Sequence, residues 1–203
     1  DVARALGPEA KADLDWTWRE GGPVNISRFL VTTLSGELQA QASISGTLTA
    51  PEITTRTSMR LADLAVLEPV AGRPLRGTLQ ATMDGVIKPL SGAFTLDIEG
   101  KSEKLRTGTK EIDTLTQDGL STLSAHLRRD ETGLAWDKLT LKTPALDSSS
   151  TGLLTSDGGR IALDASLDSL ARLLPSIKGR ANLSINAEGQ QDLWSLTLKA
   201  DGP

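Results

Sequence analysis

The residues that could carry out acid–base catalysis are few in this chain. His126 is the only histidine, and the chain contains no cysteine. A catalytic triad would need His126 as its base, and no Gly-x-Ser-x-Gly turn is present to carry the nucleophile. His126 lies on the polar side of an alternating run, so we interpret it as a solvated side chain. We expect no enzymatic activity and no catalytic residue.

Metal and nucleotide sites are equally scarce. Asp13 and Asp15, like Asp97 and Glu99, are two residues apart and point to one face of a strand, where they could hold a divalent ion or contact water. We interpret both pairs as solvated. No phosphate-binding glycine loop, zinc-binding helix motif or EF-hand spacing is present. We therefore predict no cofactor and no metal site.

Charge and composition exclude further classes of protein. The chain has 22 Lys and Arg against 26 Asp and Glu, a formal net charge of -4 and a pI near 5.1, so we expect no nucleic-acid partner. The mixed charges of residues 101–118 indicate a solvated connection, with a partner or lipid-headgroup contact as the alternative. No apolar stretch is long enough to span a bilayer, and the chain does not begin with Met. We expect a piece of a longer protein whose targeting signals lie elsewhere.

Apolar and polar residues alternate with a period of two along much of the chain. This period places successive side chains on opposite faces of a β-strand. One apolar and one wet face favour antiparallel sheet over parallel sheet, which is buried on both faces. The alternating runs span residues 38–44, 79–83, 94–98, 123–127, 161–165, 181–185 and 194–198.

Glycines separate these runs and predict turns between strands. The predicted breaks are at Gly46, Asp84-Gly85, Gly92, Gly100, Asp118-Gly119, Gly133 and Asp157-Gly158.

Three short segments have helical rather than strand-like spacing. Leucines three residues apart predict a helix near 61–68 that ends at Pro69, and a second near 167–174 that ends at Pro175. A third candidate spans residues 110–117, with Thr109 as a possible N-cap.

The leucine-rich helical segments each precede a proline and two alternating strands. This order recurs at residues 61–100 and 167–202, so we predict two internal repeat units within a single fragment, 1–203, of a repetitive β-groove protein. Coincidence between common residues is the alternative interpretation.

The order of motifs resembles a known family. The matching segments are Leu61-Ala-Asp-Leu-Ala-Val-Leu-Glu-Pro, Leu105-Arg-Thr-Gly, Ile112-Asp-Thr-Leu, the turn from Arg128 to Leu134, Leu139-Thr-Leu-Lys-Thr-Pro, and Ala165-Ser-Leu-Asp-Ser-Leu-Ala-Arg-Leu-Leu-Pro. Together they resemble the repeat region of the TamB family of translocation and assembly module subunits, within the AsmA-like, bridge-like lipid-transfer proteins of repeating β-groove type. The resemblance is best over residues 35–203.

This resemblance implies an all-β fold, in which a long antiparallel sheet is curved into a U-shaped, β-taco-like groove with an apolar interior and two or three short helices. It also implies a periplasmic location, an inner-membrane anchor absent from this fragment, and a TamA-like outer-membrane partner. The implied function is to shield and conduct phospholipids between the inner and outer membranes during outer-membrane biogenesis. The alternative is a chaperone-like module for assembling outer-membrane β-barrel proteins.

The groove interpretation predicts which side chains contact phospholipid acyl chains. These residues should share one side of one continuous sheet, whereas Gln80, Asp97, Ser124 and Asn182 should lie on the other side. A closed β-sandwich acting as a structural spacer would show the same alternation, so that alternative stays open here. The predicted lipid-binding residues are Leu79, Met83, Phe94, Leu96, Ile98, Leu123, Leu127, Leu139, Leu141, Ile161, Leu163, Leu183, Ile185, Leu196 and Leu198.

Overall fold

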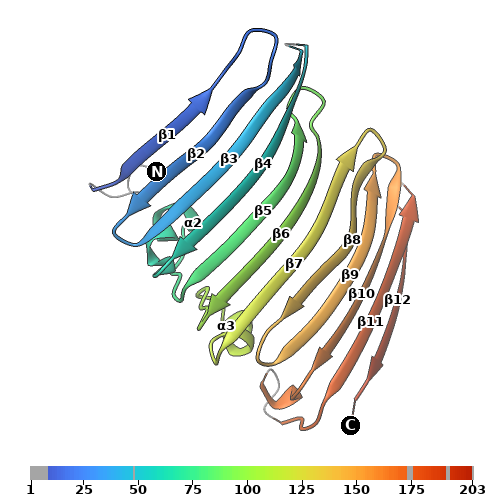
Figure 1. Ribbon diagram of the computed structural model, residues 1–203. Coiled ribbons are helices and arrows are strands. Elements are labelled where there is room, and N and C mark those ends of the chain that lie inside the picture. The colour runs from blue at the N-terminus through green and yellow to red at the C-terminus, as the bar shows by residue number, and fades with distance from the viewer. Residues whose placement is uncertain (1–8, 48, 173–175, 191–192, 203) are drawn as a thin grey trace.

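The chain forms one open antiparallel sheet. The computed structural model describes residues 9–47, 49–172, 176–190 and 193–202 (Figure 1). Over these residues the twelve strands follow one another in sequence order, make up 66% of the structure and do not close into a barrel. The prediction of an all-β, antiparallel fold is therefore confirmed. The strands are β1 (Lys11–Thr17), β2 (Val24–Thr33), β3 (Gly36–Thr47), β4 (Ala50–Leu61), β5 (Leu79–Lys88), β6 (Ala93–Glu103), β7 (Leu120–Asp130), β8 (Gly133–Lys142), β9 (Leu146–Thr155), β10 (Gly158–Leu167), β11 (Ala181–Gln190) and β12 (Leu193–Asp201).

The strand register aligns the apolar residues of neighbouring strands. Met83 of β5 pairs with Ile98 of β6, which pairs with Ala125 of β7, which pairs with Leu139 of β8. Directly paired residues of antiparallel strands share a face, and residues two apart in a strand share it too. One side of the sheet, which we call the apolar face, therefore carries these residues and those in phase with them along all twelve strands.

Two bulges keep the apolar residues in phase where the sequence spacing changes from two to three. Ile26 and Phe29 of β2 pair with Ala42 and Ala40 of β3 across such an irregularity. A second irregularity lies between Trp136 and Leu139 of β8. Because a bulge places two residues opposite one, the strand regains its register and both apolar side chains stay on the same face.

Five strands lie outside the predicted alternating runs. Bulges interrupt the alternation in β2 and β8, and β1 is short. In β4 and β9 the positions on the apolar face include hydroxyl residues such as Thr55, Thr57, Ser148 and Ser150, so these strands lack a large apolar residue at every second position. Their pairing with neighbouring strands, rather than their own pattern, makes them part of the sheet.

The predicted turns at Asp84-Gly85 and Gly100 are wrong, because these residues lie inside β5 and β6. A Cβ atom on Gly85 would lie 2.1 Å from the Thr95 carbonyl oxygen, so this position needs glycine for a close approach between strands. Gly46 also lies within a strand, near the end of β3, with a positive φ of 89°. The other predicted glycines lie between strands or at the first residue of a strand.

The helix predicted near 61–68 is only partly correct. Leu61 ends β4, and a 3₁₀ turn, η1 (Leu64–Leu67), runs directly into α2 (Glu68–Ala71). Pro69 lies in the first turn of α2 and does not end the helix. Proline is accepted there because an N–H group in the first turn has no partner within the helix.

The two other helical predictions differ in outcome. The third candidate is α3 (Lys110–Thr116), with Thr109 at the N-cap but without a capping bond from its side chain. The segment predicted at 167–174 contains the end of β10 and a short 3₁₀ turn, η2 (Leu170–Arg172), while 173–175 fall outside the described residues. Arg172 donates from Nη1 to Asp118 Oδ2 at 2.7 Å, which joins η2 to the segment after α3.

The two predicted repeat units have equivalent backbone hydrogen bonds. Leu64 N donates to Gly77 O at 2.8 Å, and Leu170 N donates to Gly179 O at 2.8 Å. Ala62, which follows β4, donates its N–H to the carbonyl oxygen of Ser35, which precedes β3. In the same way Asp168, which follows β10, donates to Ala145, which precedes β9. In both units the chain thus leaves one strand, makes a 3₁₀ turn and enters the next strand after a glycine with positive φ.

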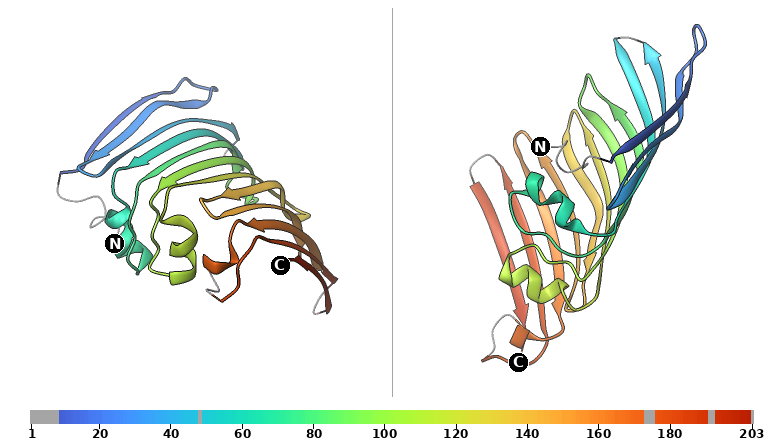
Figure 2. Two further views of the ribbon diagram at one scale, coloured as in Figure 1. Left: turned by 90° about the horizontal axis from the view of Figure 1, so that it is seen from below. Right: turned by 90° about the vertical axis from the view of Figure 1, so that its left-hand side faces the viewer.

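The helical connections all lie at the same ends of the strands, on one side of a curved sheet (Figure 2). We call these ends of the strands the helical end of the sheet. Leu64 and Leu167 are 5% and 8% exposed there, and Ser121, on the apolar face of β7, is 5% exposed. Because Leu120 beside it on the other face is exposed, the helical connections cover the apolar face at this end.

The rest of the apolar face has no second layer among the described residues. The accessible surface is 13556 Å², whereas a compact monomer of 21.5 kDa exposes about 9,200 Å². No large side chain among the described residues is fully buried. A closed sandwich would bury many large side chains between two sheets, so the described residues do not form one.

Candidate functional site

The apolar face is the candidate functional site. The register places all fifteen predicted lipid-binding residues on this face, and it places Gln80, Asp97, Ser124 and Asn182 on the opposite face. For example, Leu96 of β6 pairs with Leu127 of β7, and Leu163 of β10 pairs with Ile185 of β11. The predicted division of the residues between two faces therefore agrees with the register.

The exposure of these side chains varies across the sheet. Leu123 is 39% exposed in the centre, and Leu196 and Leu198 on the edge strand β12 are 64% and 57% exposed. The other twelve predicted residues are half-buried, because each packs against neighbours in the same layer and not against a second sheet. A monomer seldom exposes a contiguous apolar surface of more than a few hundred Å², and larger surfaces mark binding sites.

Strict alternation of apolar and polar residues does not identify several residues of this face. Ile53, Ile87, Trp136 and Leu154 belong to it through their pairing with Ile44, Phe94, Leu127 and Leu134. Trp136 is three residues before Leu139, so strict alternation places it on the wrong side. The three-residue spacing between two apolar pairs is the signal of a bulge that would have found it.

Three hydroxyl groups in the uncovered part of the apolar face are hydrogen-bonded within the sheet, whereas Ser121 Oγ, buried at the helical end, has no hydrogen-bond partner among the described residues. Ser148 Oγ donates to Leu141 O at 3.2 Å, and Ser150 Oγ accepts a hydrogen bond from Trp136 Nε1 at 3.0 Å. Thr55 Oγ1 donates to Gln41 O at 3.3 Å. An apolar ligand covering these groups would therefore break none of their bonds, which removes most of the cost of taking them out of water.

Two tryptophans of the apolar face lie over glycines of the neighbouring strand. A Cβ atom on Gly152 would lie 2.1 Å from Trp136 Cζ2, and one on Gly189 would lie 2.5 Å from Trp194 Cδ2. The indole rings fill the space above these glycines and shield the backbone there. The apolar face thus stays covered by carbon atoms where a strand has no side chain.

The opposite face is polar and carries cross-strand ion pairs. Arg56 Nε contacts Asp84 Oδ1 at 2.5 Å, and the hydrogen bond and the charge of Asp84 raise the pKa of Arg56. His126 Nδ1 lies 2.7 Å from Asp97 Oδ1, with 36% of the His126 side chain exposed. This geometry gives His126 a carboxylate partner on a solvated surface.

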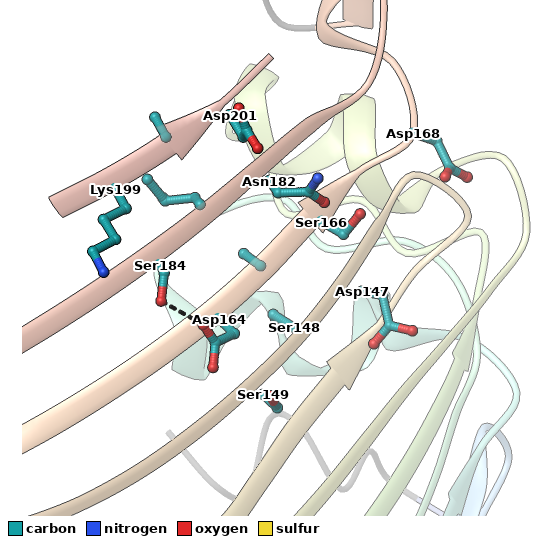
Figure 3. Close-up of a pocket in the computed structure, with 13 residues that line it drawn as sticks. Asp147, Ser148, Ser149, Asp164, Ser166, Asp168, Asn182, Ser184, Lys199 and Asp201 are labelled. Carbon is teal, nitrogen blue, oxygen red and sulfur yellow. Dashed lines mark hydrogen bonds between the residues drawn. The ribbon is translucent and has the colours of Figure 1, made fainter.

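A hollow of about 630 Å³, lined mostly by residues of the polar face, lies across β9 to β12 (Figure 3). Ser184 Oγ donates to Asp164 Oδ1 at 2.6 Å inside it. No three acidic or histidine side chains among the described residues converge to hold a metal ion. The charged residues that line the hollow are Asp147, Asp164, Asp168, Lys199 and Asp201.

Comparisons with protein-family models, curated proteins and solved structures found no match to this chain. In the part of the chain that the structure describes, no helix has the length and apolar character needed to cross a membrane. The functional assignment therefore depends on the geometry of the apolar face.

Proposed function

We propose that the apolar face binds phospholipid acyl chains and that the chain is a periplasmic segment of a TamB-like protein. In this function the sheet is the wall of a U-shaped groove that conducts phospholipids between the inner and outer membranes. The observation that carries the proposal is an apolar face across twelve strands with no second layer over its centre. The sequence motifs that resemble the TamB family support the same function.

The charge distribution on the apolar face suits hydrocarbon. By register, Arg129 at the end of β7 is the one charged residue on this face within the twelve described strands. The centre of the face therefore has no ionised group that acyl chains would have to desolvate. Burying about sixteen methylene groups at roughly 0.8 kcal/mol each offers over 10 kcal/mol of favourable transfer free energy.

The apolar rows run across the strands, so a bound lipid can move from strand to strand. At about 4.8 Å between neighbouring strands, the rows cover roughly 50 Å. The rows consist largely of leucine, isoleucine, valine and alanine, which bind hydrocarbon without directional bonds. The binding free energy is therefore nearly uniform along the path, and no position holds the lipid strongly.

A second candidate function is a chaperone-like module for outer-membrane β-barrel proteins. The observation that favours it is the uncovered apolar face across the described strands, which could also accept an apolar, unfolded segment of another protein.

Photocrosslinking distinguishes the two functions. A photoreactive amino acid replaces Leu96, Ile98 or Leu183 on the apolar face, and Asp97, Ser124 or Asn182 serves as the matched control on the polar face. We expect crosslinks to phospholipid from vesicles only for the first set, and phospholipid bound to the wild-type chain in native mass spectrometry. Equal labelling of both sets contradicts the proposal, and crosslinks to unfolded outer-membrane protein in place of lipid support the chaperone function.

A further inference from the structure

The two ends of the strands leave the apolar face open to different degrees. At the helical end the connections cover it, so that Leu167 and Ser121 are only 8% and 5% exposed. At the opposite end, which we call the hairpin end, residues 89–92 and 131–132 join neighbouring strands as short turns (Figure 1). Arg129 lies on the apolar face at this end and is exposed. A lipid on the face can therefore place its headgroup in water at the hairpin end, whereas the connections lie in the way at the helical end.

Arg129 is a cation placed among apolar residues. Its paired residues are Phe94 of β6 and Leu134 of β8, which lie on the same face. Among the described residues Arg129 forms no ion pair, whereas Nε of its neighbour Arg128, on the polar face, lies 3.6 Å from Asp130 Oδ2. A guanidinium group without an ionic partner can donate two parallel hydrogen bonds to a phosphate group.

The tryptophans of the chain gather toward the same end. Three of them lie in the half of a strand that is nearer the hairpin end, and the fourth directly follows β1 at this end. Tryptophan is enriched where hydrocarbon meets lipid headgroups, because its ring is apolar and its N–H group is polar. The hairpin end therefore has the composition of such a boundary. These residues are Trp16, Trp136 and Trp194 within strands, and Trp18 after β1.

The uncovered length of the apolar face matches one acyl chain. Leu123 is 39% exposed and lies two residues from the buried Ser121 on the same face of β7. From Arg129 to Leu123 the strand extends about 20 Å, at about 3.3 Å per residue. Half the hydrocarbon core of a bilayer, which holds the acyl chains of one leaflet, is about 15 Å thick. An acyl chain that lies along the strand with its phosphate at Arg129 therefore ends before the covered region.

We propose that Arg129 binds the phosphate group of a phospholipid at the hairpin end, with the acyl chains directed along the strands toward the helical end. The inference rests on the proposed lipid function and adds an orientation to it. Because an ion pair at an exposed position changes an affinity by only a few-fold, Arg129 orients the lipid in the centre of the sheet without stopping its movement across the strands.

Two lipids that differ only in the phosphate group test this contact. The chain is mixed in non-ionic detergent with phosphatidic acid or with diacylglycerol of the same acyl chains, and native mass spectrometry measures the bound fraction. The wild-type chain should bind phosphatidic acid about fivefold more tightly than diacylglycerol. Arg129→Gln should remove this preference and leave diacylglycerol binding unchanged. The matched control is Arg128→Gln, which makes the same change of charge on the polar face and should keep the preference.

The outcomes separate this inference from the proposed function. A wild-type chain that binds neither lipid overturns both. A wild-type chain that binds the two lipids equally, an Arg129→Gln variant that keeps the preference, or an Arg128→Gln variant that loses it overturns only the phosphate contact. Inorganic phosphate that binds as tightly as phosphatidic acid would show a site for free phosphate and would overturn the proposed lipid orientation.

Photoreactive lipids give a second readout of the orientation. A phosphatidylcholine with the reactive group in its headgroup should crosslink near Leu134 at the hairpin end. The same lipid with the reactive group at the end of an acyl chain should crosslink near Leu123 and Leu141, toward the helical end. Peptide mapping by mass spectrometry locates the crosslinks, and a reversed or equal distribution overturns the proposal.

Discussion

The apolar face contains two regions with the same chemistry and different burial. At the helical end, Leu167 is 8% exposed and lies beneath the helical connections. Two strands away in the same face, Leu196 is 64% exposed, and Leu183 between them is half-buried. Ala125 and Ala135 are small enough to be buried by their neighbours within the sheet, but the two buried leucines of the described residues, Leu64 and Leu167, both lie at the helical end. Elsewhere the backbone ladder holds the sheet together and the side chains are available to a ligand.

The largest expected effect comes from placing a carboxylate in each region. Leu167→Asp should lower the free energy of unfolding by several kcal/mol, because it buries an ion without a partner. Leu183→Asp and Leu96→Asp should leave the sheet folded, since water reaches these positions, but should abolish phospholipid binding. Thermal denaturation followed by circular dichroism measures the first effect, and native mass spectrometry measures the second.

If Leu183→Asp and Leu96→Asp unfold the chain as fully as Leu167→Asp, the centre of the face is a closed core and the comparison between the two regions fails. A folded Leu183→Asp variant that still binds phospholipid would place the lipid elsewhere.

A smaller effect is expected when the same truncation is made in both regions. Leu64→Ala at the helical end should cost about 3 kcal/mol, as for a well-packed core leucine. Leu163→Ala at the centre should cost about 1 kcal/mol, because no second layer loses contacts when the side chain is removed. Chemical denaturation of the two variants measures the difference, and equal costs would show that the two regions are packed alike.

The smallest effect concerns the opposite ends of the strands, where short hairpins replace helices. In the β7–β8 turn the Oγ–H group of Thr132 and then its backbone N–H donate to Asp130 Oδ1 and lower the pKa of Asp130 below its ordinary value of 3.8. The bonded carboxylate stabilises the folded state above pH 3.8, and this contribution is lost as the pH falls through the lower folded pKa. Asp130→Ala should therefore lower Tm slightly at pH 7 and less at pH 3.

The control for that measurement is Glu131→Ala, which removes a carboxylate from the same turn and leaves the two hydrogen bonds of Asp130 in place. A difference between Asp130→Ala and wild type that grows as the pH falls would show that the Asp130 carboxylate does not stabilise this hairpin.

Alternation predicts strands well where successive positions on one face carry apolar residues over at least three positions, as in β5, β6 and β11. It failed where hydroxyl residues occupy the apolar face, as with Ser148 and Ser150 of β9, because these residues enter the sheet by pairing with their neighbours. It also misplaced Gly85 and Gly100 as turns. A glycine that permits close packing between strands and one that permits a turn have the same local sequence signal.

The sequence by itself determined the antiparallel β class and the division of side chains between two faces, because both follow from a period of two along single strands. Only the tertiary structure decided that these strands form one open sheet, where its bulges lie, and which part of the apolar face is covered. Those features depend on strand pairing and on the positions of helical segments, so residues far apart in the chain specify them together. The alternation of a sandwich and of an open sheet is the same, and the presence of a second layer is the physical difference between them.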